Sequence, residues 1–362
     1  MPSAQTLLLS PAELAYLHTS LSLPTPIRPD GRKPTQFRPL TAETGILPGT
    51  NGSARVCFAD GTEAIVGVKA EIEKSDADQP YEISGKQRGK DGSSGATEPA
   101  ARNEWLEIAV EIPGYRDDDA TTVFLASMLS EALVADGEFA KKLVINRRFH
   151  WKLYLDIFLI SPPLSYPLPL LSLTTHLALL ATRLPRLKSE GDEDPMFDDD
   201  WEASTYLYPR SGPRGGHRPP ITLLVVSIGG NIFFDPSGEE LAVADVALAV
   251  SVAESPREEN KDQKEGAMDV DSRRALRLLA MRSIDPPSRL TPPGIPNADN
   301  PATGTGAQAK KGPAKGEVPK GVWRAPVGGA KFSTIQLMIQ QVLEAGGVAD
   351  DVLNGIDGVE LS

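Results

Sequence analysis

The stretch that decides the fold runs from residue 27 to residue 72 and reads IRPDGRKPTQFRPLTAETGILPGTNGSARVCFADGTEAIVGVKAEI. Its second part, from Gly52 to Ile72, contains two runs that are rich in β-branched and apolar residues. Between the runs stand Asp60 and Gly61, a pair that is typical of tight turns because glycine adopts a positive φ at little steric cost. The sequence therefore predicts a β-hairpin over residues 52–72.

Upstream of the hairpin, the chain carries the signals of one helix. Ser10 can serve as N-cap, Pro11 suits the first helical turn, and Glu13 completes a capping box. Leucines then follow at positions 14, 17 and 21, a spacing that places them on one narrow face. We expect a helix from Pro11 to Leu21 that docks on the body of the protein.

Downstream of the hairpin, segments with strand and helix periodicity alternate. We expect strands at residues 105–112, 151–160 and 243–253, and two more within ITLLVVSIGGNIFFD at residues 221–235. We expect helices at residues 121–136, 168–184 and 332–345, with a shorter helix after the last of these. This order is typical of mixed sheets with helices packed against them. The predicted fold class is therefore α/β, with mixed sheets of the α+β kind.

Four polar segments interrupt this order, at residues 73–103, 185–219, 254–272 and 286–321. They are rich in charge or in Pro, Gly, Ser and Ala, and such composition cannot bury enough apolar surface to offset the entropy of ordering. We expect long disordered surface inserts there. The second one contains GDEDPMFDDDWE at residues 191–202, whose carboxylates we interpret as a solvated loop rather than a metal site or a tail for a basic partner.

Composition narrows the class of protein. A chain of 362 residues with 40% hydrophobic and 24% charged residues can bury a large core. The net charge of -12 argues against a free-standing nucleic-acid binder, so any nucleic-acid contact must be local. Cys57 is the one cysteine, so an intramolecular disulfide is not possible. With one cysteine and four histidines, a zinc site is disfavoured. With no secretory pattern and no long uncharged apolar run, we expect an intracellular, reducing compartment and no membrane span.

The string IRPDGR at residues 27–32 resembles the opening motif of ribonuclease PH-type proteins, and residues 37–72 continue the match. The later strings WKLYLDIFLI and FFDPSGEELAVADVALAVSVAE, and the C-terminal helix, fit the same order. Within this family, the chain is similar to the catalytically silent ring subunits of the RNA-degrading exosome.

The resemblance implies the ribonuclease PH fold, in which two βαβ-type halves (a ribosomal protein S5 domain 2-like core) pack together. The implied division is an N-terminal helix in residues 1–25, a core in 26–253 with inserts at 73–103 and 185–219, and flexible inserts at 254–272 and 286–321. Residues 273–285 and 322–362 then complete the second half with the C-terminal helices. Subunits of this fold form a ring around a channel that threads RNA, and active members use orthophosphate to cleave the terminal phosphodiester bond.

The resemblance also indicates where phosphorolysis would take place. In active relatives, a basic loop between a strand and the next helix holds phosphate, and paired aspartates lie in a later strand region. Here the loop reads SPPLSYPLPLLSL from Ser161, has no Arg or Lys before residue 183, and contains four prolines that lack an amide proton. Asp245 stands alone in the aspartate region. We expect no catalytic residue, no metal and no cofactor, and therefore no enzyme activity.

Three arginines are candidates for RNA contact: Arg116, Arg147 and Arg148. A solvated or subunit-interface role fits each of them at least as well. His150 and Trp151 could stack on bases, yet a tryptophan in a strand is more typical of the core, which is the interpretation we prefer.

Two further clusters have competing interpretations. Asp235, Glu239 and Glu240 could form an acid–base or magnesium cluster, but we favour a turn at residues 235–238 followed by surface acids. Arg28 and Arg32, with Asp30 between them, are interpreted as structural. The cluster Lys310, Lys311, Lys315 and Lys320 is compatible with a basic tail or a localisation signal.

The leading hypothesis is a non-catalytic subunit of the exosome ring that supports 3'-to-5' RNA processing and decay, including ribosomal RNA maturation and mRNA turnover. Its partners would be other ribonuclease PH-type ring subunits, cap subunits and RNA in the channel, in a hetero-oligomer without membrane contact, in nucleus, nucleolus and cytoplasm. One alternative is a phosphorolytic 3'-5' exoribonuclease that acts through a shared subunit interface. Another is a module outside the exosome, such as an RNA chaperone, which would need a continuous basic face.

Overall fold

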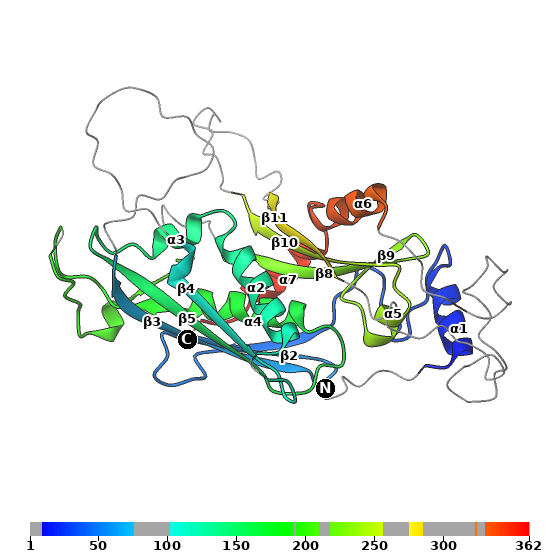
Figure 1. The fold of residues 1–362 in the computed structure, drawn as a ribbon, viewed down its shortest axis with the longest axis horizontal. Helices are drawn as coiled ribbons and strands as arrows, with labels where there is room; N and C mark the ends of the chain where they lie inside the picture. The colour runs from blue at the N-terminus through cyan, green and yellow to red at the C-terminus, as the bar shows by residue number, and fades with distance from the viewer. Residues whose placement is uncertain are drawn as a thin grey trace, which may run out of the picture.

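The computed structural model describes residues 9–75, 102–116, 118–191, 193–209, 218–255, 275–284, 323 and 330–361. The helices are α1 (Pro11–Leu21), α2 (Ala120–Val134), α3 (Glu138–Lys142), α4 (Leu168–Ala181), α5 (Gly238–Ala242), α6 (Phe332–Val342) and α7 (Val348–Asp357). The strands are β1 (Leu40–Thr44), β2 (Gly52–Phe58), β3 (Glu63–Lys74), β4 (Leu106–Glu111), β5 (Phe149–Leu159), β6 (Arg183–Leu184), β7 (Thr205–Tyr206), β8 (Ile221–Ile228), β9 (Asn231–Phe234), β10 (Val246–Glu254) and β11 (Leu276–Ile284). Two main sheets with helices between and outside them make up the fold (Figure 1).

The first sheet has the order β1-β2-β3-β5-β4, in which only the β4–β5 pair is parallel. The predicted hairpin is confirmed as β2 and β3, which pair from Cys57 and Glu63 outward. In the connecting turn, Gly61 has a φ of 85°, and the Asp60 side chain accepts a 2.9 Å hydrogen bond from the amide of Thr62. The turn chemistry expected from the sequence therefore sets the register of this sheet.

The second sheet is antiparallel and has the order β11-β10-β8-β9. All eight residues of β8 are buried, which explains its continuous apolar sequence. Helix α4, also buried along its whole length, packs on β2 and β3 of the first sheet and on β8 of the second. The main core therefore lies around α4, between the two sheets.

The outer face of the second sheet carries α6, which contacts β8 and β10. Met281 of β11 lines one pocket together with residues of α6, whereas the next residue, Arg282, pairs with Glu131 of α2. Because successive strand residues point to opposite faces, α2 and α6 cover opposite faces of this sheet. Figure 1 shows the same arrangement, with α2 between the sheets and α6 outside them.

Helix α1 covers a smaller core at the other end of the second sheet. Its predicted capping box is present, and Leu14 and Leu21 are buried in a cluster that includes Leu224, Phe233 and Trp323. The expected docking face of this helix is therefore confirmed. Among the described residues, no helix is long and apolar enough to cross a membrane.

The sequence missed β1, α3, α5, β6, β7 and β11, and the helix predicted over residues 168–184 ends at Ala181, so that Arg183 and Leu184 form β6 instead. β11 contains Arg277 and Arg282, whose charges are neutralised by Asp136 and Glu131 across the fold. The expected inserts at 73–103, 254–272 and 286–321 lie almost entirely outside the described residues. The remaining one was expected to be disordered as well, but residues 185–191 and 193–209 are ordered: Leu187 bridges to Phe197, which in turn packs on Trp151.

Candidate functional site

A buried ion pair connects the opening motif to the second sheet. The guanidinium of Arg28 donates two hydrogen bonds of 2.7 Å to the carboxylate of Glu240, and neither side chain has exposed surface. Arg28 also donates to the carbonyls of Phe234 (3.2 Å) and Asp235 (3.0 Å). A charge-assisted fork of this kind is among the strongest side-chain contacts, and here it is fully removed from water.

Asp235 forms the second half of this network. Its buried carboxylate accepts hydrogen bonds from Arg32 (2.9 Å) and from the Arg38 guanidinium (2.6 and 2.8 Å). The backbone of Asp235 has a φ of 49°, in the left-handed region, which is unfavourable for a residue with a side chain. The hydrogen bonds from the arginines offset this conformational cost. Arg38 extends the network to Asp60 in the hairpin turn.

These contacts decide the role of the carboxylates near residue 235. The expected turn is present and leads into α5, where Ser237 and Glu240 form a capping box. The expectation of a surface acid was wrong for Glu240, which is buried, and Asp235 in the turn is buried as well, because arginines contributed by the opening motif neutralise both in the interior. Carboxylates held in this way are not available as an acid–base pair, and the structural interpretation of Arg28 and Arg32 is confirmed.

The segment after β5 offers little to an anion. The Ser161 hydroxyl accepts a 3.0 Å hydrogen bond from the amide of Glu63 and is thereby tied to the β2–β3 turn. Helix α4 follows with Pro167 as its N-cap and Pro169 in its first turn, and no side chain caps it. A proline lacks the amide proton that a phosphate oxygen would need, so this helix start is depleted in donors.

Asp245 stabilises a turn. Its carboxylate accepts a 2.8 Å hydrogen bond from the amide of Gly229, between β8 and β9. The Nε2 atom of His18, on α1, lies 4.0 Å from the other carboxylate oxygen. Among the described residues, no three His, Cys, Asp or Glu side chains are grouped so that they could hold a metal ion.

The three arginine candidates do not form one patch. Arg116 follows β4, is exposed and pairs with Asp118 at 3.0 Å. Arg147 and Arg148 precede β5, and Arg148 contacts Asp194 of the acidic segment at 3.1 Å. Because β4 and β5 are parallel, Arg116 lies at the end of the sheet where β5 finishes, and the pair at residues 147 and 148 where it begins. The 11 residues of β5 separate these ends by roughly 35 Å.

His150 and Trp151 belong to the core, as we expected. The His150 ring stacks on Trp105 with centroids 4.1 Å apart, and its Nδ1 atom lies 2.9 Å from the hydroxyl of Ser75. Trp151 packs on Phe197 at 5.0 Å. Both rings are less than a tenth exposed, so neither can stack on a base without rearrangement.

Sequence reasoning missed Arg38. The signal was present, because three arginines fall within residues 28–38 with Asp30 as the only carboxylate among them. Such an excess of charge beside a hairpin predicts partners elsewhere in the chain. Those partners, Asp235 and Glu240, are about 200 positions away and could not be identified without the tertiary structure.

Known proteins resemble this chain over most of its length. The profile of the 3' exoribonuclease family, domain 1, matches residues 36–185. Exosome complex component RRP42 of Saccharomyces cerevisiae is 31% identical over 249 residues, which cover 67% of this chain and 81% of that protein. The protein of the same name from Schizosaccharomyces pombe is 34% identical over 263 residues, covering 68% and 79%. A solved archaeal exosome core has a chain with a TM-score of 0.47 and 19% identity, covering 75% of this chain and 84% of its own.

Proposed function

Because the chain belongs to the RRP42 family of ribonuclease PH-type proteins, we propose that it is a structural subunit of an RNA exosome ring. Among the strings at residues 27–72, ETG, NGSAR and VGVKAEI are most similar to the ribosomal-RNA-processing protein 42 type. Two relatives carrying that name align with about four-fifths of their length, which is the observation that carries the proposal. The subunit supports 3'-to-5' RNA processing and decay, including ribosomal RNA maturation and mRNA turnover, by forming part of the channel.

The subunit is catalytically silent in this proposal. Phosphorolysis has to bind orthophosphate and the scissile phosphate with cations, hydroxyls or backbone amides. The segment from Ser161 to Leu173 has no cation, and its first hydroxyl is engaged with Glu63. Asp245, in the region where active relatives carry paired aspartates, is held by the Gly229 amide. These features support a silent site.

RNA contact is proposed for Arg116, Arg147 and Arg148. Their positions at the two ends of β4 and β5 suit an RNA strand that meets the subunit at two separate points. Asp118 and Asp194 already neutralise part of this charge, so phosphate has to compete with them. The contribution of each arginine to affinity is therefore expected to be small.

The partners are other ribonuclease PH-type ring subunits and the cap subunits. The subunit acts in nucleus, nucleolus and cytoplasm, where exosome-dependent processing and decay take place. The lysine cluster at residues 310, 311, 315 and 320, a weak localisation signal, lies outside the described residues.

The proposal is tested by RNA release with and without orthophosphate, first with the purified chain and then with the chain co-expressed with the other ring subunits. We expect stable co-purification of a ring and no phosphate-dependent product that depends on this chain. Nucleoside diphosphates that form only with phosphate, and that disappear with Asp245→Ala, would instead establish a phosphorolytic exoribonuclease acting through a shared interface.

A further inference from the structure

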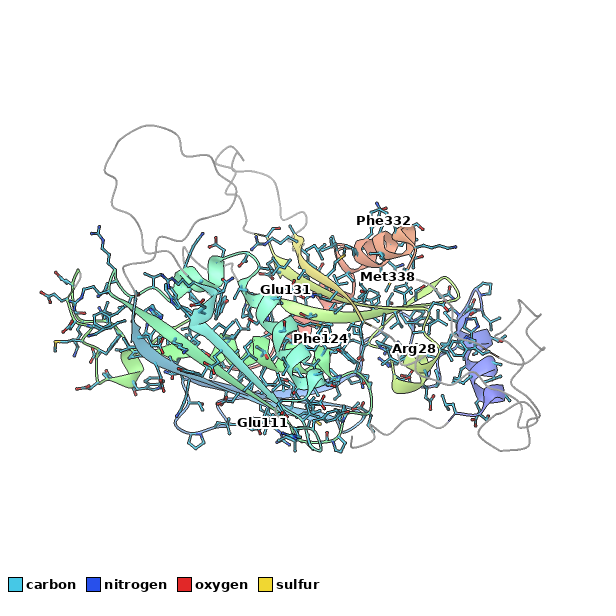
Figure 2. All side chains as sticks on the ribbon, in the orientation of Figure 1. Arg28, Glu111, Phe124, Glu131, Phe332 and Met338 are labelled. Atoms are coloured by element: carbon cyan, nitrogen blue, oxygen red, sulfur yellow. The ribbon has the colours of Figure 1, made fainter. Side chains whose placement is uncertain are left out.

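The acidic segment, residues 191–202, lies against the start of β5. It carries seven carboxylates and no lysine or arginine. Figure 1 shows it in green at the opposite end of the molecule from α1, and Figure 2 shows that its side chains extend outward there. Arg147 and Arg148, two of the arginines proposed to contact RNA, directly precede β5. A run of negative charge therefore lies beside two cations that RNA would use.

Backbone hydrogen bonds shape this part of the chain into a two-stranded loop. The amide of Lys188 donates to the carbonyl of Met196 (2.8 Å), and the amide of Asp198 donates to the carbonyl of Arg186 (2.9 Å). The ammonium group of Lys188 also pairs with the carboxylate of Asp198 at 2.9 Å. The charge of Asp198 is therefore balanced within the loop, and the tip at residues 189–195 is closed by these contacts.

Two further contacts attach the loop to the start of β5. The Phe197 ring packs on Trp151 of β5 with centroids 5.0 Å apart, and Trp151 is only 8% exposed. The side-chain amide of Asn146, in the turn before β5, donates a 3.0 Å hydrogen bond to the carbonyl of Glu193 in the tip. An apolar contact at the base of the loop and a polar contact at its tip thus hold it in place.

The attached loop brings a carboxylate onto one of the proposed RNA contacts. Asp194 lies 3.1 Å from Arg148, and the two side chains are 79% and 55% exposed. An ion pair this exposed is weak, so a phosphate can displace the carboxylate. Because the loop is attached beside Arg148, however, the carboxylate competes from within the same chain and at a high effective concentration.

We propose that the acidic segment is a displaceable cover over Arg148 that weakens RNA binding at this end of β5. An RNA phosphate exchanges with the Asp194 carboxylate, and Arg148 binds RNA only while the tip of the loop is turned away. This inference rests on the proposed function, because it concerns the proposed RNA contact of Arg148, and it adds a regulation of that contact. The other carboxylates of the segment act in the same direction where they lie within the Debye length of about 8 Å.

The test measures RNA affinity of the full chain co-expressed with the other ring subunits, by fluorescence anisotropy of a labelled single-stranded RNA over a salt series. Asp194→Asn removes the competing charge. It should raise affinity about two- to fivefold at low salt and steepen the slope of log affinity against log salt by up to about 1. Asp199→Asn is the matched control, because it removes the same charge from the same segment but leaves the pair of Arg148 and Asp194 in place.

Two more variants separate displacement of the loop from a general loss of negative charge. In an Arg148→Ala background, Asp194→Asn should give no gain, because the cation that the carboxylate covers is gone. Phe197→Ala changes no charge but loosens the attachment of the loop to Trp151. It should raise RNA affinity in the same direction, by about twofold, since the effective concentration of the carboxylate falls.

The outcomes distinguish the inference from the proposed function. A gain for Asp194→Asn that is lost in the Arg148→Ala background, and is absent from Asp199→Asn, supports the cover. An equal gain in Asp199→Asn, or one that persists without Arg148, overturns it. If Asp194→Asn gives no gain while Arg148→Ala weakens binding, the cover is refuted and the RNA contact stands. If Arg148→Ala binds RNA as the unchanged chain does, the proposed contact fails first and the inference falls with it.

Discussion

Arg28 and Glu240 are 212 positions apart in the sequence, and their side chains meet in a two-pronged ion pair with no exposed surface. The pair connects the opening motif of the chain to helix α5 at the far end of the second sheet. Arg28 therefore stabilises the fold by joining these two parts of the chain.

Removing one partner of this pair is expected to be costly. Glu240→Gln leaves the Arg28 charge buried without its carboxylate, which should lower the free energy of unfolding by about 3 to 5 kcal/mol. Arg55→Ala is the control, because Arg55 pairs with Glu63 at the surface of the hairpin, where water screens the pair, and its loss should cost far less than that of the buried pair. Urea unfolding followed by circular dichroism measures both changes. If both variants lost the same free energy of unfolding, the buried pair would stabilise the protein no more than the surface pair does.

Acid should weaken the contact between Asp60 and Arg38. Burial would raise the pKa of Asp60, but hydrogen bonds from Thr62 and the charge and hydrogen bond of Arg38 lower it below its ordinary value of 3.8. The stability that comes from the ionised carboxylate is therefore complete above pH 3.8 and is lost as pH falls through the lower folded-state pKa. Asp60→Asn should be less stable than the unchanged chain at pH 7, and the difference should vanish at the acid end of a pH series of urea unfolding curves. A difference that grows towards acid pH would contradict this assignment.

Gly229 holds the β8–β9 turn close to α1. A Cβ atom there would lie 2.1 Å from the Ser22 hydroxyl oxygen, and the φ of 58° disfavours any residue with a side chain. Gly230→Ala is the matched control, because its φ of 94° is also positive but no atom lies within 4 Å of the added carbon. We expect Gly229→Ala to destabilise the protein by at least about 1 kcal/mol more than the control. Faster amide exchange in α1, measured by mass spectrometry, should accompany the loss in Gly229→Ala alone.

RNA affinity of the assembled ring should report on the proposed arginine contacts. Replacing Arg147 and Arg148 together by alanine should weaken binding for all sequences and reduce the slope of log affinity against log salt by up to about 2. Arg116→Ala should reduce it by up to about 1, independently of the first change because the sites lie at opposite ends of β5. Arg55→Ala, which removes an exposed arginine outside these positions, serves as control. A salt slope that stays unchanged in both the Arg147 and Arg148 double variant and Arg116→Ala would show that these arginines lie outside the RNA path.

Much of the fold could be predicted from the sequence, because it depends on interactions between near neighbours. The capping box at Ser10 and Glu13, the turn at Asp60 and Gly61, and the continuous apolar run of β8 are each local, and each appears in the structure where the sequence indicated. The same local strings at residues 27–72 were enough to indicate the family, which the similarity to the RRP42 proteins bears out.

The tertiary structure decided which charges are buried and which apolar residues remain exposed. The sequence indicates a turn at Asp235 and a surface acid at Glu240, and only their approach to Arg28, Arg32 and Arg38 makes it possible for both carboxylates to lie in the core. Strand β11 is similar, because its arginines are compatible with a buried sheet only when Glu131 and Asp136 neutralise them. The sequence also predicted an apolar C-terminal helix at residues 332–345, but it could not tell that Met338 is completely buried whereas Leu337 is 55% exposed. The physical reason is the same in each case: the cost of burying a charge, and the gain from burying an apolar side chain, depend on groups that are distant in sequence and become neighbours only in the folded chain.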